Sequence, residues 1–251
     1  MKSSPLLRAG GYLFCSLCGM IVGGYLPTPF AELLHLLFVF FCVFVESRLS
    51  KIQKTTTFSL QNKAKTFLLF PIFFAATLGA NLLSAKITLL LGGNVPTVTP
   101  SLPLFVGAVL LAPLAEELLF RHLLISLFSP YGKTKAVLLS ALFFALAHGN
   151  FFQMPYAFIA GCLLCAAAIV GNSVLFPVLF HLLYNLAAFF GNAQANLILL
   201  IIFGVLSLPA AYFLCRKMPR RQPGKQLPRA EISLLLLFGA VMLVFSVFRL
   251  L

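Results

Sequence analysis

Long apolar stretches separated by short polar breaks make up most of this chain of 251 residues. A helix that spans the hydrocarbon core of a membrane needs about 20 predominantly apolar residues. Nine stretches approach or reach that length, at about residues 10–25, 31–45, 66–85, 104–128, 136–147, 151–170, 174–190, 195–215 and 232–250. The pattern therefore predicts an all-α, polytopic integral membrane bundle of about eight or nine transmembrane helices.

The composition supports this pattern and excludes an ordinary soluble domain. Hydrophobic residues make up 61% of the chain and charged residues only 9%, and the mean hydropathy is +1.04. Such values are typical of membrane proteins with several spans. The six cysteines all lie in or at the edge of apolar stretches, where helix packing accounts for them.

The net charge of +13 raises the question of a nucleic-acid partner, and the distribution of the charge answers it. If the N-terminus is cytoplasmic and successive stretches alternate in direction, fifteen of the 18 basic residues fall on the inner side. Lys86 and Arg249 then lie outside, and Arg121 lies within the bilayer. The charge thus predicts a multi-pass cell-membrane protein that contacts anionic lipid and has no nucleic-acid partner.

The sequence predicts three parts. Residues 1–103 hold about three transmembrane helices and a basic cytoplasmic loop at 48–65. Residues 104–190 form a helical core with the candidate chemistry, and residues 191–251 form C-terminal helices with a second basic loop at 216–229. Glu32 and His35, near the outer end of the second stretch, are predicted to be interfacial polar residues.

Two carboxylates and a guanidinium, Glu116, Glu117 and Arg121, interrupt the fourth apolar stretch. A charged side chain near the middle of a spanning helix costs about 2.5–3.5 kcal/mol on insertion scales. Glu117 and Arg121 are four residues apart and face the same way, whereas Glu116 lies about 100° around the helix. A second carboxylate is not needed to pair one arginine, so the stretch indicates a function beyond locking helices together.

Polar side chains recur in two later stretches, as His148, which follows Phe144 by one helical turn, and as His181 and Asn185, also one turn apart. At comparable depths, these groups and the carboxylates can meet in one layer of the bundle. A carboxylate there can act as general base toward a water molecule, and a histidine can donate to a developing oxyanion. Alternatively, Glu116, His148 and His181 match the three ligands of a catalytic zinc with one open position, with Glu117 as the base. Spacing alone leaves both mechanisms open.

Three motifs at these residues resemble the CPBP intramembrane proteases, which include type II CAAX prenyl endopeptidases and bacteriocin-processing or abortive-infection-type proteins. The motifs are EExxxR at residues 116–121, FxxxH at 144–148 and HxxxN at 181–185, in that order. They lie between residues 104 and 190, one third of the chain. The resemblance implies a peptidase that acts on peptides or membrane proteins within or next to the bilayer.

The resemblance also implies roles for individual residues. Glu116 and His148 would position and activate the attacking water. Glu117, His181 and Asn185 would complete the site through an oxyanion contact or an orienting hydrogen bond, and Arg121 would hold the carboxylates. The family has been described both as metalloproteases and as glutamate-based enzymes; we favour the glutamate mechanism and keep zinc as the alternative cofactor.

Other proteolytic chemistries lack their residues in this sequence. The chain contains no aspartate, no HExxH and no GxSxG, which excludes two-aspartate, site-2-type zinc and serine-elbow mechanisms. Two classes of alternative remain, a small proton-coupled transporter and a non-catalytic scaffold or immunity protein. For a peptidase, processing of bacterial peptides or bacteriocins and self-immunity are the expected roles.

Overall fold

The computed structural model describes residues 4–23, 25–49, 62–95 and 99–215. Most of the predicted basic loop at 48–65, the whole loop at 216–229 and the last predicted helix at 232–250 lie outside the described residues. Within the described part the chain is helical and contains no β-strand, which confirms the predicted all-α class.

The helices follow the apolar stretches closely. They are α1 (Pro5–Gly23), α2 (Phe30–Leu49), α3 (Lys63–Phe67), α4 (Leu69–Leu90), a continuous central segment (Leu102–Tyr131), α8 (Lys133–Ala147), α9 (Met154–Gly171), α10 (Leu175–Phe190) and α11 (Ala193–Cys215). Gly132, whose φ of 106° suits a residue without Cβ, separates the central segment from α8.

Six helical segments of the described part are long and apolar enough to cross a membrane. They are α1, α2, α3 with α4, the central segment, α9 and most of α11. The helices α8 and α10 have 15 and 16 residues, so at about 1.5 Å per residue they fall short of a hydrocarbon core of about 30 Å. The polytopic membrane fold is therefore supported, whereas a count of eight or nine spans is not confirmed.

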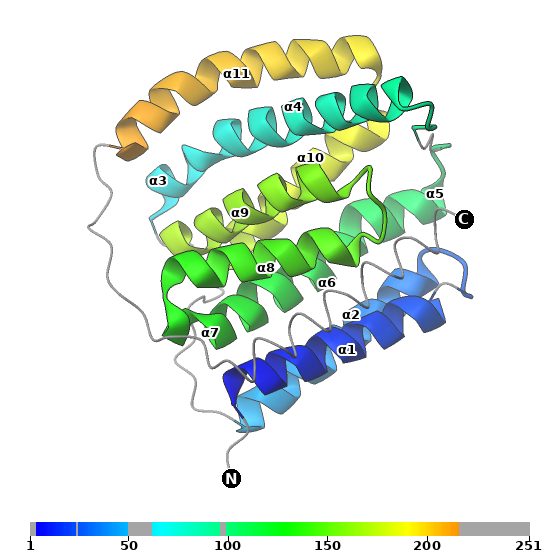
Figure 1. Ribbon diagram of the computed structural model, residues 1–251, viewed down its shortest axis with the longest axis vertical. Coiled ribbons are helices and arrows are strands. Elements are labelled where there is room, and N and C mark those ends of the chain that lie inside the picture. The colour runs from blue at the N-terminus through cyan, green and yellow to red at the C-terminus, as the bar shows by residue number, and fades with distance from the viewer. Residues whose placement is uncertain (1–3, 24, 50–61, 96–98, 216–251) are drawn as a thin grey trace.

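The helices pack side by side from one edge of the bundle to the other, in an order that differs from their order along the chain (Figure 1). The helix α11 lies on α4, which packs on α9 and α10; α8 and the central segment follow, and α1 and α2 form the opposite edge. Only 6% of the spanning window of α11 is buried. We infer that its apolar side chains face lipid, because such a surface would be unfavourable in water.

The central segment, which carries the acidic motif, changes its helical geometry twice. It contains π-helical stretches at Phe105–Leu111 and Leu118–Leu124, and α6 (Ala112–Glu117) lies between them. Each stretch offers a backbone carbonyl to another helix: Ala108 accepts from the Asn185 side chain at 2.9 Å, and Phe120 accepts from the Ser140 hydroxyl at 2.7 Å. Such stretches are frequent at functional sites, and here they attach α10 and α8 to the motif.

Small residues bring α8 and α9 close together beside the second motif. A Cβ added at Gly161 of α9 would lie 3.0 Å from the backbone Cα of Ala141 and 3.3 Å from the Phe144 ring. Close approach of this kind is typical of helix packing in membranes. Gly161 thus supports the position of the Phe144 ring.

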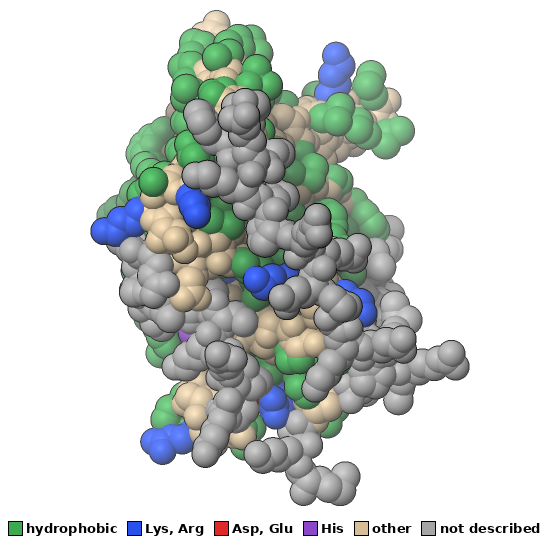
Figure 2. Space-filling model, turned by 90° about the vertical axis from the view of Figure 1, so that its left-hand side faces the viewer, with side chains coloured by type: hydrophobic (Ala, Val, Ile, Leu, Met, Phe, Trp, Pro, Cys, Tyr) green, Lys and Arg blue, Asp and Glu red, His purple; other side chains and the backbone are tan. Residues whose placement is uncertain are grey.

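Basic side chains gather at one end of the bundle. Figure 2 shows Lys and Arg at several places on this end and no Asp or Glu among its described atoms. The end of α2, the whole of α3 and the start of α8 lie on this side in Figure 1, and these segments carry Arg48, Lys63, Lys65, Lys133 and Lys135. This asymmetry is the one that the positive-inside rule relates to orientation. That this end and the N-terminus are cytoplasmic stays a prediction.

Candidate active site

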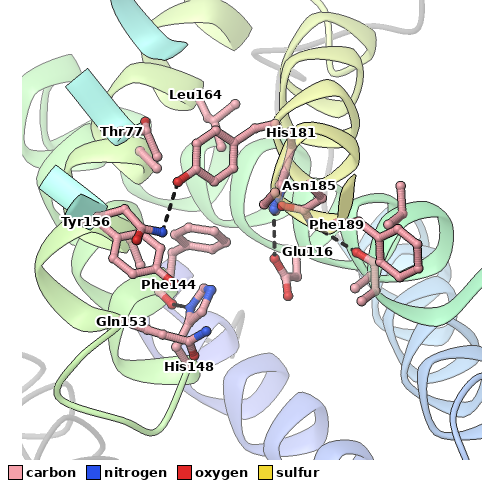
Figure 3. Close-up of a pocket in the computed structure, with 18 of the residues that line it drawn as sticks. Thr77, Glu116, Phe144, His148, Gln153, Tyr156, Leu164, His181, Asn185 and Phe189 are labelled. Atoms are coloured by element: carbon pink, nitrogen blue, oxygen red, sulfur yellow. Dashed lines mark hydrogen bonds and ion pairs between the residues drawn. The ribbon is translucent and has the colours of Figure 1, made fainter. Parts of the chain in front are cut away.

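Four of the six predicted site residues line one cavity of about 390 Å³ in the middle of the bundle (Figure 3). Glu116 comes from α6, His148 from the residue after α8, and His181 and Asn185 from α10. The α4 and α9 helices complete the wall with residues such as Phe73 and Tyr156. A cavity of this size, with mostly apolar walls and a few convergent polar groups, is typical of a ligand or substrate site.

Glu117 and Arg121 do not line this cavity but lie directly behind it. Both side chains are fully buried, and Arg121 Nε is 3.0 Å from Glu117 Oε2. The other oxygen, Glu117 Oε1, is 2.8 Å from His181 Nδ1. The carboxylate of Glu117 therefore connects the buried arginine to a histidine on the cavity wall, and Arg121 pairs with Glu117.

The hydrogen bond to Glu117 fixes the protonation of one nitrogen of His181. An ionised carboxylate only accepts hydrogen bonds, so Nδ1 of His181 is the protonated nitrogen and donates this hydrogen bond to Glu117. The other ring nitrogen, Nε2, lies 3.8 Å from Glu116 Oε2. His181 is thus held from behind and presents Nε2 on the side of Glu116.

His148 is oriented in a similar way by the backbone. Its Nδ1 is 2.9 Å from the carbonyl oxygen of Phe144, and since a carbonyl only accepts, Nδ1 donates. In the neutral ring Nε2 then keeps its lone pair and can accept a proton. Figure 3 shows the His148 ring beside Gln153 and on the same cavity as Glu116. The position just beyond the last helical residue of α8 leaves the ring half-buried.

Asn185 is fixed by the first π-helical stretch. Its amide nitrogen donates to the carbonyl oxygen of Ala108 at 2.9 Å. An asparagine amide has two N–H donors and a carbonyl acceptor. One N–H of Asn185 is used to hold the side chain, and the second N–H and the oxygen can contact a ligand.

The aromatic ring of Phe144 holds these parts together. The guanidinium carbon of Arg121 lies 4.0 Å from the centre of this ring, a cation–π contact. The rings of His148 and His181 approach Phe144 edge-on, with centroids 4.8 Å and 5.8 Å away. Sequence reasoning used Phe144 only to recognise a motif, whereas the structure places it between the buried charge and both histidines.

Several cavity residues were missed from the sequence. Gln153 and Tyr156 line the cavity from the start of α9, and Asn150 Nδ2 donates to Gln153 Oε1 at 2.7 Å. Polar residues that follow the FxxxH motif so closely could have been noted as a signal. Glu32 also lines the cavity. His35 is only 5% exposed, and its predicted place near the membrane interface stays a prediction.

The three residues predicted as alternative zinc ligands, Glu116, His148 and His181, do not converge on one point. In the part of the chain that the structure describes, no group of three or more His, Cys or Glu side chains could hold a metal ion. Glu116 and His181 approach to 3.8 Å, but His148 does not complete a common site with them. The residues as arranged do not fit a three-ligand zinc, and we assign no step to a metal.

Together, the apolar helices and the enclosed set of carboxylate, histidine and amide groups define a membrane-embedded bundle with a hydrolase-like polar site. Residues 98–187 match the model of a protein family described as type II CAAX prenyl endopeptidase Rce1-like. All three motifs lie inside this segment, and the resemblance expected from them is confirmed. The family is one of proteases, which supports a hydrolase. No curated protein and no solved structure shows a significant match to the chain.

Proposed function

We propose that the chain is an endopeptidase that hydrolyses peptide bonds of peptides or membrane proteins within or next to the bilayer. The observation that carries this proposal is that Glu116 and His148, each with an acceptor atom available, share a cavity with His181 and Asn185. Acceptors and donors are both needed, because attack of water on a peptide requires removal of a proton and stabilisation of an oxyanion. Processing of bacterial peptides or bacteriocins, or self-immunity, is the role we favour.

The geometry supports a mechanism without a covalent intermediate. Water loses a proton to the Glu116 carboxylate, assisted by His148 Nε2, while its oxygen bonds to the peptide carbonyl carbon. The resulting oxyanion accepts hydrogen bonds from the free Asn185 N–H and from His181 Nε2 when that nitrogen is protonated. The C–N bond then breaks, and the leaving amine takes the proton from Glu116. Glu117 and Arg121 keep His181 in place throughout.

The test uses the full chain in liposomes and a set of quenched fluorescent peptides, prenylated with a CAAX end or unmodified. We expect Glu116→Gln and His148→Gln to lower kcat by about 10²–10⁴-fold, the usual contribution of general acid–base groups. Glu46→Gln and His122→Gln make the same chemical changes outside the cavity and serve as matched controls. Full activity of Glu116→Gln would contradict the mechanism. Peptide binding without cleavage by the wild-type chain would favour the scaffold or immunity alternative.

Metal dependence is tested separately with a strong chelator. In the glutamate mechanism that we favour, turnover of the chelated protein equals that of the untreated protein. Loss of turnover that added Zn²⁺ restores would instead contradict the glutamate mechanism and show that turnover depends on the metal. Metal analysis of the purified protein, done on the same sample, links either outcome to the amount of bound zinc.

A further inference from the structure

A second, smaller cavity of about 170 Å³ lies on the other side of the catalytic pair. Glu116, Phe144, His148 and Gln153 border both this cavity and the larger one. The two groups proposed to activate water therefore form part of a wall between two spaces. Only one of these spaces contains His181 and Asn185, the proposed oxyanion contacts.

The far wall of the small cavity is formed by α1 and α2 and contains a buried polar pair. Ser16 of α1 and His35 of α2 are 4% and 5% exposed, and Ser16 Oγ lies 2.8 Å from His35 Nε2. The other ring nitrogen of His35 is 3.8 Å from Glu32 Oε2. Burying such groups between apolar helices costs free energy unless they are hydrogen-bonded, and the contact between Ser16 and His35 offsets this cost while leaving both side chains on the cavity wall.

We infer that the small cavity is the compartment that supplies the hydrolytic water, and that His35 on its far wall is a positioning residue for that water. This inference rests on the proposed function. A peptide in the larger cavity displaces the water there, yet each turnover consumes one water molecule at Glu116. The replacement must reach Glu116 from a side that the peptide does not fill, and the small cavity lies on that side.

The dimensions and chemistry of the small cavity fit water. A water molecule occupies about 30 Å³ in the liquid and needs two to four polar partners in a protein. A cavity of about 170 Å³ holds several such molecules but not a peptide segment. Its polar lining residues are Ser16, His35, Glu116, His148 and Gln153. Ser16 and His35 lie outside residues 98–187, the segment that matches the family.

The inference is tested by filling or enlarging the compartment at one position. Ser16→Leu fills it with an apolar side chain, and we expect kcat for the liposome peptide to fall at least tenfold while KM stays within twofold. Ser16→Ala enlarges it and lets water replace the lost hydroxyl at His35, so kcat stays within about threefold. Gly11→Leu adds the same bulk to α1 where an added Cβ meets nothing within 4 Å, and it serves as the control.

A purely structural role of Ser16 predicts the opposite order, because losing the hydrogen bond to His35 would then harm Ser16→Ala at least as much as Ser16→Leu. That order overturns the inference, and so does unchanged kcat in Ser16→Leu. Binding of the labelled peptide, measured by fluorescence anisotropy, must be retained in both variants. Loss of binding together with kcat would mean that the peptide site itself is disturbed and would also overturn the inference.

A second pair of variants decides the question if Ser16→Leu does not fold. His35→Phe keeps a ring but removes both nitrogens, and we expect a kcat at least tenfold lower; His35→Gln keeps polar atoms and should stay within threefold. Equal kcat in the two variants overturns the inference. Failure of the proposed function is distinguishable, since it shows as an inactive wild type or a fully active Glu116→Gln. If Ser16→Leu is fully active and Glu116→Gln is inactive, the inference about the water compartment is wrong but the proposed function still stands.

Discussion

Glu116 and Glu117 are neighbours in the chain but lie in opposite surroundings. Glu116 is partly exposed to two cavities and is 3.8 Å from its nearest cationic candidate, His181. Glu117 is fully buried, with one oxygen on Arg121 and the other on His181. A buried carboxylate held by an ion pair and a hydrogen bond stabilises structure, whereas one with a free oxygen and access to water can take up a proton. The comparison teaches that a single motif can supply both an anchor and a reactive group.

The largest expected effect comes from breaking the anchor. Arg121→Met leaves Glu117 buried with only His181 as partner, and removal of one member of a buried ion pair costs about 3–5 kcal/mol. Unfolding of the chain in mixed micelles by a denaturing detergent measures the change. We expect the double variant Arg121→Met with Glu117→Gln to recover part of the loss, because it leaves no unpaired buried charge.

The peripheral ion pair of α1 and α2 is the control for this prediction. Arg8 Nε is 3.1 Å from Glu46 Oε2, which also accepts from the Tyr12 hydroxyl at 2.8 Å. The Arg8 and Glu46 side chains are each 10% exposed, whereas those of Arg121 and Glu117 are not exposed at all. Arg8→Met should therefore cost less than Arg121→Met. A larger loss in Arg8→Met would mean that α1 and α2, rather than the motif, anchor the bundle.

A matched pair of substitutions at the two glutamates sharpens the comparison. Glu117→Gln leaves the buried Arg121 guanidinium beside a neutral amide, and we expect a cost of about 3 kcal/mol, the lower end of the range for a broken buried ion pair, because the amide oxygen still attracts the guanidinium. Glu116→Gln should change the free energy of unfolding by no more than about 0.5 kcal/mol, as at surface positions. The same detergent titration measures both. Equal losses would show that the two carboxylates share one structural role.

The helices, and the convergence of the three motifs on one site, could be predicted from the sequence because both depend on local signals. Apolar runs predict helices from composition, and spacings of four residues place Glu117 with Arg121 and His181 with Asn185 on common faces. The spacings could not predict which glutamate faces a cavity, since that depends on the rotation of the central segment against α10. The π-helical stretches, which set this rotation, have no clear local signal in the sequence.

The missed residues have a similar physical explanation. Ser16 and His35 come together only because α1 packs on α2 and both pack beside α6, a set of contacts between helices that periodicity does not encode. Near the end of an apolar stretch, His35 looked like an interfacial residue. The division of the chain into three parts at 103 and 190, and the orientation in the membrane, stay predictions.

A smaller effect is expected at Gly161, which supports the ring between the two regions. An alanine there would crowd the backbone of Ala141 and the Phe144 ring, and overpacking costs about 1–3 kcal/mol. We expect a value near the lower end, because only one methyl group is added. Detergent unfolding measures the loss. Gly11→Ala, where an added Cβ meets nothing within 4 Å, is the control and should lose no stability.

The Phe144 ring offers the most direct test of the boundary between the two regions. The ring of Phe144 contacts Arg121 with its face and lies nearly perpendicular to the rings of both histidines. Phe144→Leu keeps an apolar side chain but removes the cation–π contact, worth about 0.5–1 kcal/mol at exposed sites and about 2 kcal/mol or more when desolvated. Arg121 is fully buried and Phe144 is 2% exposed, so we expect a total loss of about 2 kcal/mol or more.

Phe144→Leu should also slow catalysis by the folded protein. Without the ring, His148 and His181 lose the surface that sets their orientation, and a small displacement of a catalytic group can cost about 10²-fold in rate. We expect kcat, measured on the folded fraction of the variant, to fall at least tenfold. Leu119→Phe, at a fully buried position outside both cavities, would instead reduce stability through overpacking before it affects kcat. If Phe144→Leu keeps its kcat, the histidines are oriented by their hydrogen bonds alone, and the ring serves only to pack against the Arg121 guanidinium.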